Sequence, residues 1–254
     1  MNNLSPNLID STSYAYNSDS KKGVYIIHGF TNSTYETKEF AQYMGKKGFY
    51  AVADNLPGHG TSVEECNRCK YQNWIDFVEQ RVAEMSSKCD SIYLVGISMG
   101  SVLALHLSTL FPINAAIFAA TVLKFKDYFG TRVLTPMLHK IVPFRKKKYS
   151  YPKEIRDSIN FLGYHSWPMS AVNEFRKLTN KVRKDLPLIN TPALIMHSNL
   201  DKLQHPANTD LVFNSISSKI KEKFFVDAAG HNLFIKSPDQ EKIFKKAAAF
   251  LNKF

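Results

Sequence analysis

The chain has 254 residues, of which 44% are hydrophobic and 22% are charged, values typical of a globular protein and not of a disordered one. Its length suits one large α/β domain. Its longest apolar stretch, near residues 115–120, is far shorter than the roughly 20 residues of a membrane-spanning helix. Residues 1–13 lack the basic leader and apolar run of a signal peptide. We therefore expect a soluble protein of the cytoplasm.

The net charge is +11, and nearly all of it lies in one central segment. Residues 122–190 contain 15 Lys and Arg against 5 Asp and Glu, a net charge of +10, and the remaining residues carry +1. A nucleic-acid-binding protein usually combines a basic surface with a recognisable binding motif, and no such motif accompanies this segment. We therefore expect no nucleic-acid partner.

Apolar runs and amphipathic stretches alternate along most of the chain. Strands separated by helices predict βαβ units and a mostly parallel sheet flanked by helices. Runs that are apolar throughout suit strands that are covered on both faces. The strand-like runs are residues 24–27, 50–53, 91–97, 115–120, 193–198 and 223–226, and the helix-like stretches are about 34–46, 73–86, 99–110, 207–216 and 239–253.

This alternation breaks in residues 122–190, where short helix-like pieces and several prolines surround the basic run RKKKYSY. We predict that this segment is a cap without a core of its own, inserted into a core of residues 1–121 and 191–254. Thr135-Pro136 predicts a helix N-cap followed by proline at the first helical position. One face of that helix would then carry Met137, Leu138, Ile141 and Val142.

The three cysteines predict neither a disulfide framework nor a metal site. Cys66 and Cys69 have the spacing of half a zinc site, but no second pair of ligands completes the four that a structural zinc ion needs. We expect free thiols in a reducing compartment, and no metal or cofactor.

The sequence GISMG at residues 96–100 joins an apolar run to a helix-like stretch. A G-x-S-x-G turn between a strand and a helix is typical of a nucleophile elbow, in which the serine hydroxyl stands clear of the sheet. The absence of side chains at Gly96 and Gly100 lets the strand and the helix approach closely. The helix N-terminus adds partial positive charge beside the hydroxyl. Ser98 is the candidate nucleophile, and the alternative is an incidental turn.

A serine hydroxyl needs a base that accepts its proton and a carboxylate that orients the base. Among eight histidines, His231 follows the last strand-like run, so we expect it at the same sheet edge as Ser98. Asp201 follows another strand-like run, and the chain order Ser98, Asp201, His231 is typical of such a triad. Asp227 is the alternative carboxylate. His197 lies within a strand and is interpreted as a core residue.

Acyl transfer also needs N–H donors for the oxyanion of the tetrahedral intermediate. The backbone N–H of Met99, the residue after the nucleophile, is one candidate. The other comes from the loop HGFT at residues 28–31, where Gly29 permits a backbone that directs the N–H of Phe30 toward the reacting carbonyl oxygen. The alternative for this loop is a plain strand-ending turn.

Together the segments HGFTNST (28–34), DNLPGHGTS (54–62) and GISMGS (96–101), the Asp201 loop and the Gly230-His231 pair resemble the α/β-hydrolase family. More closely, they resemble its small bacterial carboxylesterases and monoacylglycerol lipases. The resemblance extends from about residue 23 to the end of the chain.

The resemblance implies an α/β-hydrolase fold with the basic cap inserted between strands 6 and 7, as a lid over the active site. It implies a catalytic triad of Ser98, Asp201 and His231. The N–H groups of Phe30 and Met99 would be the oxyanion donors. The PGHG loop at residues 57–60 matches a family loop that is usually structural, so His59 is not assigned a catalytic role.

We therefore predict a serine hydrolase that cleaves carboxylic esters, such as acylglycerols or similar acyl esters, through an acyl-enzyme intermediate. The alternatives among enzymes are an acyl thioesterase or lysophospholipase, and then a C–C bond hydrolase. The alternative outside enzymes is a catalytically silent binding protein with a hydrolase fold. A complete triad in the expected chain order counts against silence.

The charge of the cap leaves three interpretations. Its lysines could be solvated while its apolar residues pack on the body of the protein. The lid could instead dock on an anionic lipid surface, with residues 145–148 near the headgroups. A third interpretation is an anionic acyl substrate, such as a thioester of coenzyme A. The apolar residues of the cap in these interpretations are Phe125, Tyr128, Phe129, Val133, Leu134, Met137, Leu138, Ile141, Val142 and Phe144. The sequence carries no signal for an oligomeric state.

Overall fold

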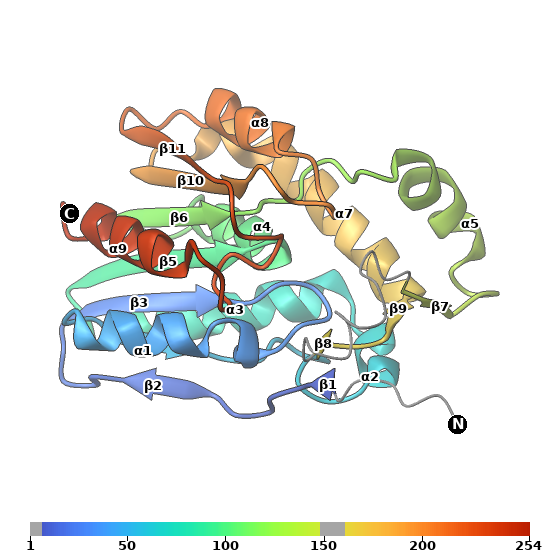
Figure 1. The fold of residues 1–254 in the computed structure, drawn as a ribbon, viewed down its shortest axis with the longest axis horizontal. Helices are drawn as coiled ribbons and strands as arrows, with labels where there is room; N and C mark the ends of the chain where they lie inside the picture. The colour runs from blue at the N-terminus through green and yellow to red at the C-terminus, as the bar shows by residue number, and fades with distance from the viewer. Residues whose placement is uncertain (1–6, 148–160) are drawn as a thin grey trace.

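The structure is a computed structural model that describes residues 7–147 and 161–254. Its central sheet has seven strands in the order β11-β10-β6-β5-β3-β4-β2 (Figure 1). Neighbouring strands are parallel, except that β2 runs antiparallel to β4. The mostly parallel sheet expected from the sequence is confirmed. Its strands are β2 (Tyr14–Tyr16), β3 (Lys22–Ile27), β4 (Tyr50–Ala53), β5 (Ser91–Ile97), β6 (Ala115–Ala119), β10 (Ala193–Ser198) and β11 (Lys221–Val226).

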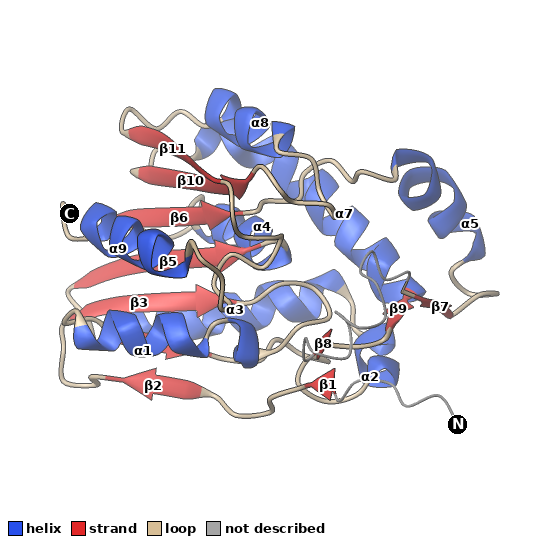
Figure 2. Cartoon of the chain, in the orientation of Figure 1, coloured by secondary structure: helices blue, strands red, loops and turns tan. Residues whose placement is uncertain are grey.

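Helices cover both faces of this sheet (Figure 2). Side chains alternate along each strand, so Val24 and Ile26 of β3 face one core and Tyr25 and Ile27 face the other. No helix among the described residues is long and apolar enough to cross a membrane. One layer contains α1 (Lys38–Lys46) and α9 (Gln240–Leu251), and the other contains α3 (Tyr71–Ser86), α4 (Met99–Leu107), α7 (Met169–Asp185) and α8 (Ala207–Ser215); η1 (Thr34–Glu36), α2 (Val63–Arg68) and η3 (Leu186–Leu188) are short helices in the connections.

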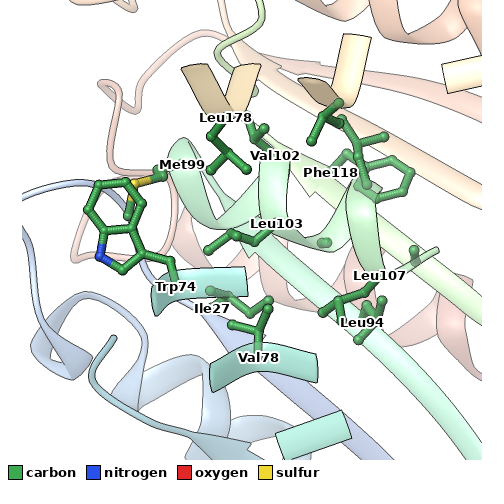
Figure 3. Packing of buried hydrophobic residues seen from close by; sticks show 14 of the residues in the cluster. Ile27, Trp74, Val78, Leu94, Met99, Val102, Leu103, Leu107, Phe118 and Leu178 are labelled. Carbon is green, nitrogen blue, oxygen red and sulfur yellow. The ribbon is translucent and has the colours of Figure 1, made fainter. Parts of the chain in front are cut away.

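Helix α4 lies at the centre of the larger core, and all of its residues are buried. In Figure 3, Val102 of α4 packs near Leu178 of α7, and Leu107 packs near Leu94 of β5. Most side chains of α4 are apolar, and such a helix needs this complete enclosure. Because Ser98 lies immediately before α4, the packing of this helix fixes the serine relative to the sheet.

Residues 122–190, the predicted cap, lie in the chain between β6 and β10, the fifth and sixth strands of the sheet in chain order. The expected position between strands 6 and 7 assumes two sheet strands ahead of β3, whereas the described sheet has only β2 there. Strand β7 pairs antiparallel with β9, and β8 pairs with β1, near the N-terminus. The elements concerned are β1 (Asn7–Leu8), the π-helix η2 (Gly130–Leu134), α5 (Thr135–Leu138), β7 (Phe144–Lys146), β8 (Phe161–Leu162) and β9 (Ser166–Pro168).

Three local predictions in the cap were wrong. Helix α5 ends at Leu138, so it does not include Ile141 or Val142. Helix α7 spans 17 residues rather than a short piece, and it buries Phe175 and Leu178 in the larger core. Thr135 is the first residue of α5 and not its N-cap, because η2 continues directly into α5. Its hydroxyl donates to the carbonyl of Gly130 (2.8 Å) inside the preceding turn. The cap therefore joins the main core through α7.

Candidate active site

Three loops bring Ser98, Asp201 and His231 together at the carboxyl edge of the sheet. They follow β5, β10 and β11, and these strands are parallel, so their C-terminal ends lie at the same edge (Figure 1). His231 Nε2 lies 3.0 Å from Ser98 Oγ, and His231 Nδ1 lies 2.7 Å from Asp201 Oδ2. The three side chains thus form one continuous row of hydrogen bonds from the hydroxyl to the carboxylate.

Ser98 has a strained backbone, with φ of 57° and ψ of −114°. A residue with a side chain rarely adopts a positive φ, so this conformation indicates a functional constraint. The two glycines explain how the turn closes. A methyl group on Gly96 would lie 2.2 Å from the carbonyl oxygen of Gly100, and one on Gly100 would lie 2.1 Å from that of Ile27. Larger residues would push the strand and the helix apart.

The buried carboxylate of Asp201 accepts three hydrogen bonds and has one further close contact. Its Oδ1 accepts the backbone N–H groups of Leu203 (2.8 Å) and Gln204 (2.9 Å). Its Oδ2 contacts His231 and also His197, whose Nε2 lies 3.0 Å away. Burial alone would raise the pKa of Asp201, but the contacts with His197 and His231 hold that pKa well below its ordinary value. Asp201 is therefore ionised at neutral pH.

The ionised state of Asp201 determines which ring nitrogen of His231 carries the proton. A carboxylate can only accept, so Nδ1 of His231 must donate to it. In the neutral ring, Nε2 is then an acceptor, and it faces the hydroxyl of Ser98. This tautomer is the one that a general base for Ser98 requires.

The HGFT loop lies directly beside Ser98. A methyl group on Gly29 would lie 3.2 Å from Ser98 Cβ and 3.2 Å from Glu36 Oε2, which leaves little room for any side chain there. Within residues 7–147 and 161–254, the backbone N–H groups of Phe30 and Met99 donate to no protein acceptor. Met99 is the first residue of α4, where N–H groups have no partner inside the helix. Both N–H groups are available for a ligand beside the candidate nucleophile.

Two buried side chains hold Gly29 from opposite sides. His28 Nδ1 lies 2.8 Å from the carbonyl oxygen of Gly29, and His28 Nε2 accepts the N–H of Leu56 (3.0 Å). Burial lowers the pKa of His28 to about 4, so the ring is neutral with its proton on Nδ1. The carbonyl of Gly29 and the N–H of Phe30 belong to one planar peptide group, so this bond fixes the direction of that N–H. Glu36 Oε2 accepts the N–H of Gly29 (2.7 Å).

The alternative residues lie away from the serine or have other partners. Asp227 is exposed and accepts a hydrogen bond from Asn199 Nδ2 (2.7 Å). His106 lies in α4 and contacts Glu79 (2.8 Å). His197 is buried in β10, as a core histidine would be, yet it also touches the candidate triad through Asp201. In the described parts of the chain, no group of three or more His, Cys, Asp or Glu side chains could hold a metal ion.

The chain is similar to known proteins of one family. A family model described as Serine aminopeptidase, S33 (Hydrolase_4) matches residues 18–238. The thermostable monoacylglycerol lipase of Bacillus sp. (strain H-257) is 26% identical over 217 residues, which cover 79% of this chain and 78% of that protein. The carboxylesterase of Bacillus subtilis (strain 168) is 21% identical over 235 residues, which cover 91% of this chain and 93% of the relative.

A solved structure from a study of LipS and LipT, two metagenome-derived lipolytic enzymes, superposes on this chain with a TM-score of 0.84. Its sequence is 22% identical, and the match covers 96% of this chain and 98% of that chain. This likeness confirms the fold expected from the sequence.

Proposed function

This chain belongs to the family described as Serine aminopeptidase, S33, and we propose that it hydrolyses carboxylic esters through a triad of Ser98, His231 and Asp201. The observation that carries the proposal is the continuous row of hydrogen bonds from Ser98 Oγ through His231 to Asp201. The names of the two bacterial relatives, a monoacylglycerol lipase and a carboxylesterase, favour esters over the peptides that the family description names.

In the acylation step, Ser98 Oγ attacks the ester carbonyl carbon while His231 Nε2 accepts the hydroxyl proton. Asp201 stabilises the imidazolium that forms, because its carboxylate accepts the Nδ1 proton. The N–H groups of Phe30 and Met99 donate to the oxyanion of the tetrahedral intermediate. When the intermediate collapses, the bond between the acyl carbon and the alcohol oxygen breaks, and His231 gives its proton to the leaving alkoxide.

Water completes the reaction by the same route. His231 Nε2 accepts a proton from a water molecule, and the oxygen of that water attacks the acyl carbon. Collapse of the second tetrahedral intermediate breaks the bond to Ser98 Oγ, which takes the proton back from His231. The products are a carboxylic acid and an alcohol, and every proton transfer passes through one nitrogen atom.

We propose acylglycerols, or acyl esters of similar size, as the substrate class. An acyl thioester or a lysophospholipid would pass through the same acyl-enzyme with a different leaving group, so these remain the alternatives. Comparing kcat/KM for monoacylglycerols, p-nitrophenyl esters of graded chain length, acyl-coenzyme A and aminoacyl anilides ranks them. A preference for the anilides would overturn the choice of esters.

Replacement of the serine tests the proposal. Ser98→Ala should abolish ester hydrolysis and labelling by a fluorophosphonate probe. Ser101→Ala is the matched control, because Ser101 lies three residues after Ser98, in α4, and its buried hydroxyl is hydrogen-bonded to Thr121 (2.6 Å). Ester hydrolysis retained by Ser98→Ala would contradict the proposed nucleophile. A wild-type protein that neither labels nor hydrolyses any ester would be a silent binding protein.

We also propose that the cap docks on an anionic lipid surface through residues 128–146, here called the cap arm. Large apolar side chains of the arm are exposed, with Met137 at 70% and Ile141 at 76% of full exposure. Its charged residues are all basic and all exposed: Arg132, Lys140, Arg145 and Lys146. Exposed apolar side chains among cations are the composition of an interfacial membrane anchor. The other exposed apolar residues of the arm are Tyr128, Phe129, Val133, Leu134, Leu138, Val142 and Phe144.

The exposure of the cap arm revises two details of the sequence interpretation. Only Phe125 of the apolar set packs against the larger core, where its ring meets Phe175 of α7, so the remaining residues do not form a layer beneath solvated lysines. Lys147 does not point toward headgroups, because its Nζ donates to Thr31 Oγ1 (2.6 Å). Lys148 lies outside the described residues.

The domain boundaries and the compartment belong to the same proposal. We propose a core of residues 1–121 and 191–254 and a cap of residues 122–190, with α7 as the part of the cap that enters the core. The three cysteines are free thiols, which supports a reducing compartment such as the cytoplasm.

A further inference from the structure

The cap contacts the loop that carries the proposed oxyanion donor. Thr31, which follows Phe30, is held by the cap at two atoms. Its carbonyl oxygen accepts the N–H of Tyr164 (3.1 Å), and its hydroxyl accepts a hydrogen bond from Lys147 Nζ (2.6 Å). The ring of Phe30 stacks on Trp167, with centroids 6.3 Å apart and planes at 10°. Three separate cap residues thus touch the two residues at this turn.

Thr31 has a φ of 63°, a left-handed conformation that is a genuine outlier for a β-branched residue. Such a conformation persists only where the surrounding structure holds it, and these sites cluster where function needs a fixed geometry. The turn is closed internally by a hydrogen bond from Asn32 N–H to the Gly29 carbonyl oxygen (3.2 Å). The cap supplies the contacts to Thr31 itself.

Gly163 of the cap lies so close to Thr31 that only a residue without a side chain fits there. It has a φ of 78°, and a methyl group on it would lie 1.9 Å from the carbonyl oxygen of Thr31. The next residue, Tyr164, is tied to the core at its other end. Its hydroxyl donates to the carbonyl oxygen of Gly58 (2.9 Å) and accepts the N–H of Thr61 (3.3 Å). The cap segment is therefore fixed between two loops of the core.

We propose that Gly163, Tyr164 and Lys147 are positioning residues for the oxyanion hole. They hold Thr31 in its left-handed conformation, and through it they set the direction of the preceding N–H group, that of Phe30. This inference rests on the proposed function, in which that N–H stabilises the oxyanion. The cap then contributes to the chemical step, and loosening its contacts with Thr31 lowers kcat more than it changes KM.

Substitution of two glycines tests this role. Gly163→Ala places a methyl group against the carbonyl oxygen of Thr31. Gly48→Ala is the control, because Gly48 also has a positive φ, of 92°, but nothing lies within 4 Å of an added methyl group. We expect Gly163→Ala to lower kcat on p-nitrophenyl butyrate by on the order of 10²-fold, as loss of one oxyanion donor does. Its KM should stay within about twofold, and Gly48→Ala should keep wild-type kcat.

If Gly163→Ala does not fold, a second pair of variants tests whether the cap contact with Thr31 affects kcat. Thr31→Val removes the hydroxyl that accepts from Lys147 but keeps the branched shape, whereas Thr31→Ser keeps the hydroxyl. We expect kcat to fall about tenfold in the valine variant and to recover in the serine variant, with KM unchanged in both.

Two results would overturn the inference. One is wild-type kcat in both Gly163→Ala and Thr31→Val. The other is a loss in Gly163→Ala that Gly48→Ala reproduces. If either occurs while Ser98→Ala is inactive, the proposed hydrolase activity stands and only the role of the cap is wrong.

Discussion

His197 Nε2 lies 3.0 Å from Asp201 Oδ2, the same oxygen that His231 contacts. This second contact helps to keep the buried carboxylate ionised and fixed in place. We expect His197→Phe to lower kcat about tenfold, which is about 1.4 kcal/mol in the activation free energy. The free energy of unfolding should fall by about 1–3 kcal/mol, because a buried carboxylate loses a partner.

His106→Phe is the matched control for this prediction. His106 is also buried and also contacts a carboxylate, that of Glu79, but it lies at the far end of α4 from Ser98. Its replacement should lower stability in urea unfolding and leave kcat unchanged. If both variants keep wild-type kcat, His197 contributes only to packing.

Two aspartates that are near His231 in the sequence or in space should respond differently to replacement. Asp201→Asn should lower kcat by on the order of 10⁴-fold, because the amide favours the wrong tautomer of the histidine. Asp227→Asn should leave kcat unchanged, because this exposed carboxylate contacts Asn199 instead. Steady-state kinetics on one p-nitrophenyl ester measures both variants. The reverse pattern would transfer the role to Asp227.

Glu36 offers a further kinetic test of the oxyanion loop. Its side chain is buried, and Oε2 accepts the N–H of Gly29 (2.7 Å). Glu36→Gln keeps an acceptor for that N–H, whereas Glu36→Ala removes it. We expect kcat to fall about tenfold in the alanine variant only, with KM unchanged in both. Equal kcat in the two variants would show that the backbone alone holds Gly29.

The same residue should make stability depend on pH. Burial raises the pKa of Glu36 above its ordinary value of 4.5, so the folded protein binds this proton more tightly than the unfolded chain. The stabilisation is complete below about pH 4.5 and is lost as the pH rises through the raised value. Glu36→Gln cannot lose this proton, so its stability relative to wild type should increase across that window and then level off. Urea unfolding at a series of pH values measures the difference, and a difference that is constant with pH would refute the prediction.

Membrane docking can be measured with vesicles. The wild-type protein should co-sediment with vesicles of anionic phospholipid and much less with vesicles of neutral phospholipid, because the cap arm carries only basic charges. Ile141→Ser should weaken binding to anionic vesicles without changing hydrolysis of a soluble ester. Leu188→Ser is the control, because Leu188 is also an exposed aliphatic residue (64%) and lies outside the arm, in η3. Equal binding to both kinds of vesicle would contradict the proposal.

The sheet and the candidate triad could be predicted from the sequence because their signals are local. Each central strand is an apolar run of four to seven residues, and the runs at residues 50–53, 91–97 and 193–198 coincide with the observed strands. In a parallel sheet, residues that follow the strands gather at one edge. The positions of Ser98 and His231 directly after predicted strands were therefore enough to predict that the two residues lie close together.

The remainder of the site depends on long-range contacts that no local pattern encodes. Lys147 lies in a run of lysines that look equivalent in the sequence, and its bond to Thr31, 116 residues away, is a long-range contact that the sequence does not reveal. Glu36 is an acidic residue in a polar stretch, where burial of a carboxylate is unexpected. For His197, the one feature of the sequence that could have indicated contact with the triad is its position four residues before Asp201. Helix α7 has apolar residues at helical spacing, but its many basic residues obscured them.

The burial of α7 limits how this protein can be re-engineered. Phe175, Leu178 and Val182 belong to the same core as α4, although they lie in the cap by sequence. A chimera that exchanged the whole of residues 122–190 would replace these core contacts beside α4, the helix that directly follows the nucleophile. Grafts that stop before Met169 would keep that support and exchange only the outer part of the cap. The boundary for transplanting substrate preference thus lies at the start of α7, about 20 residues before the end of the insertion.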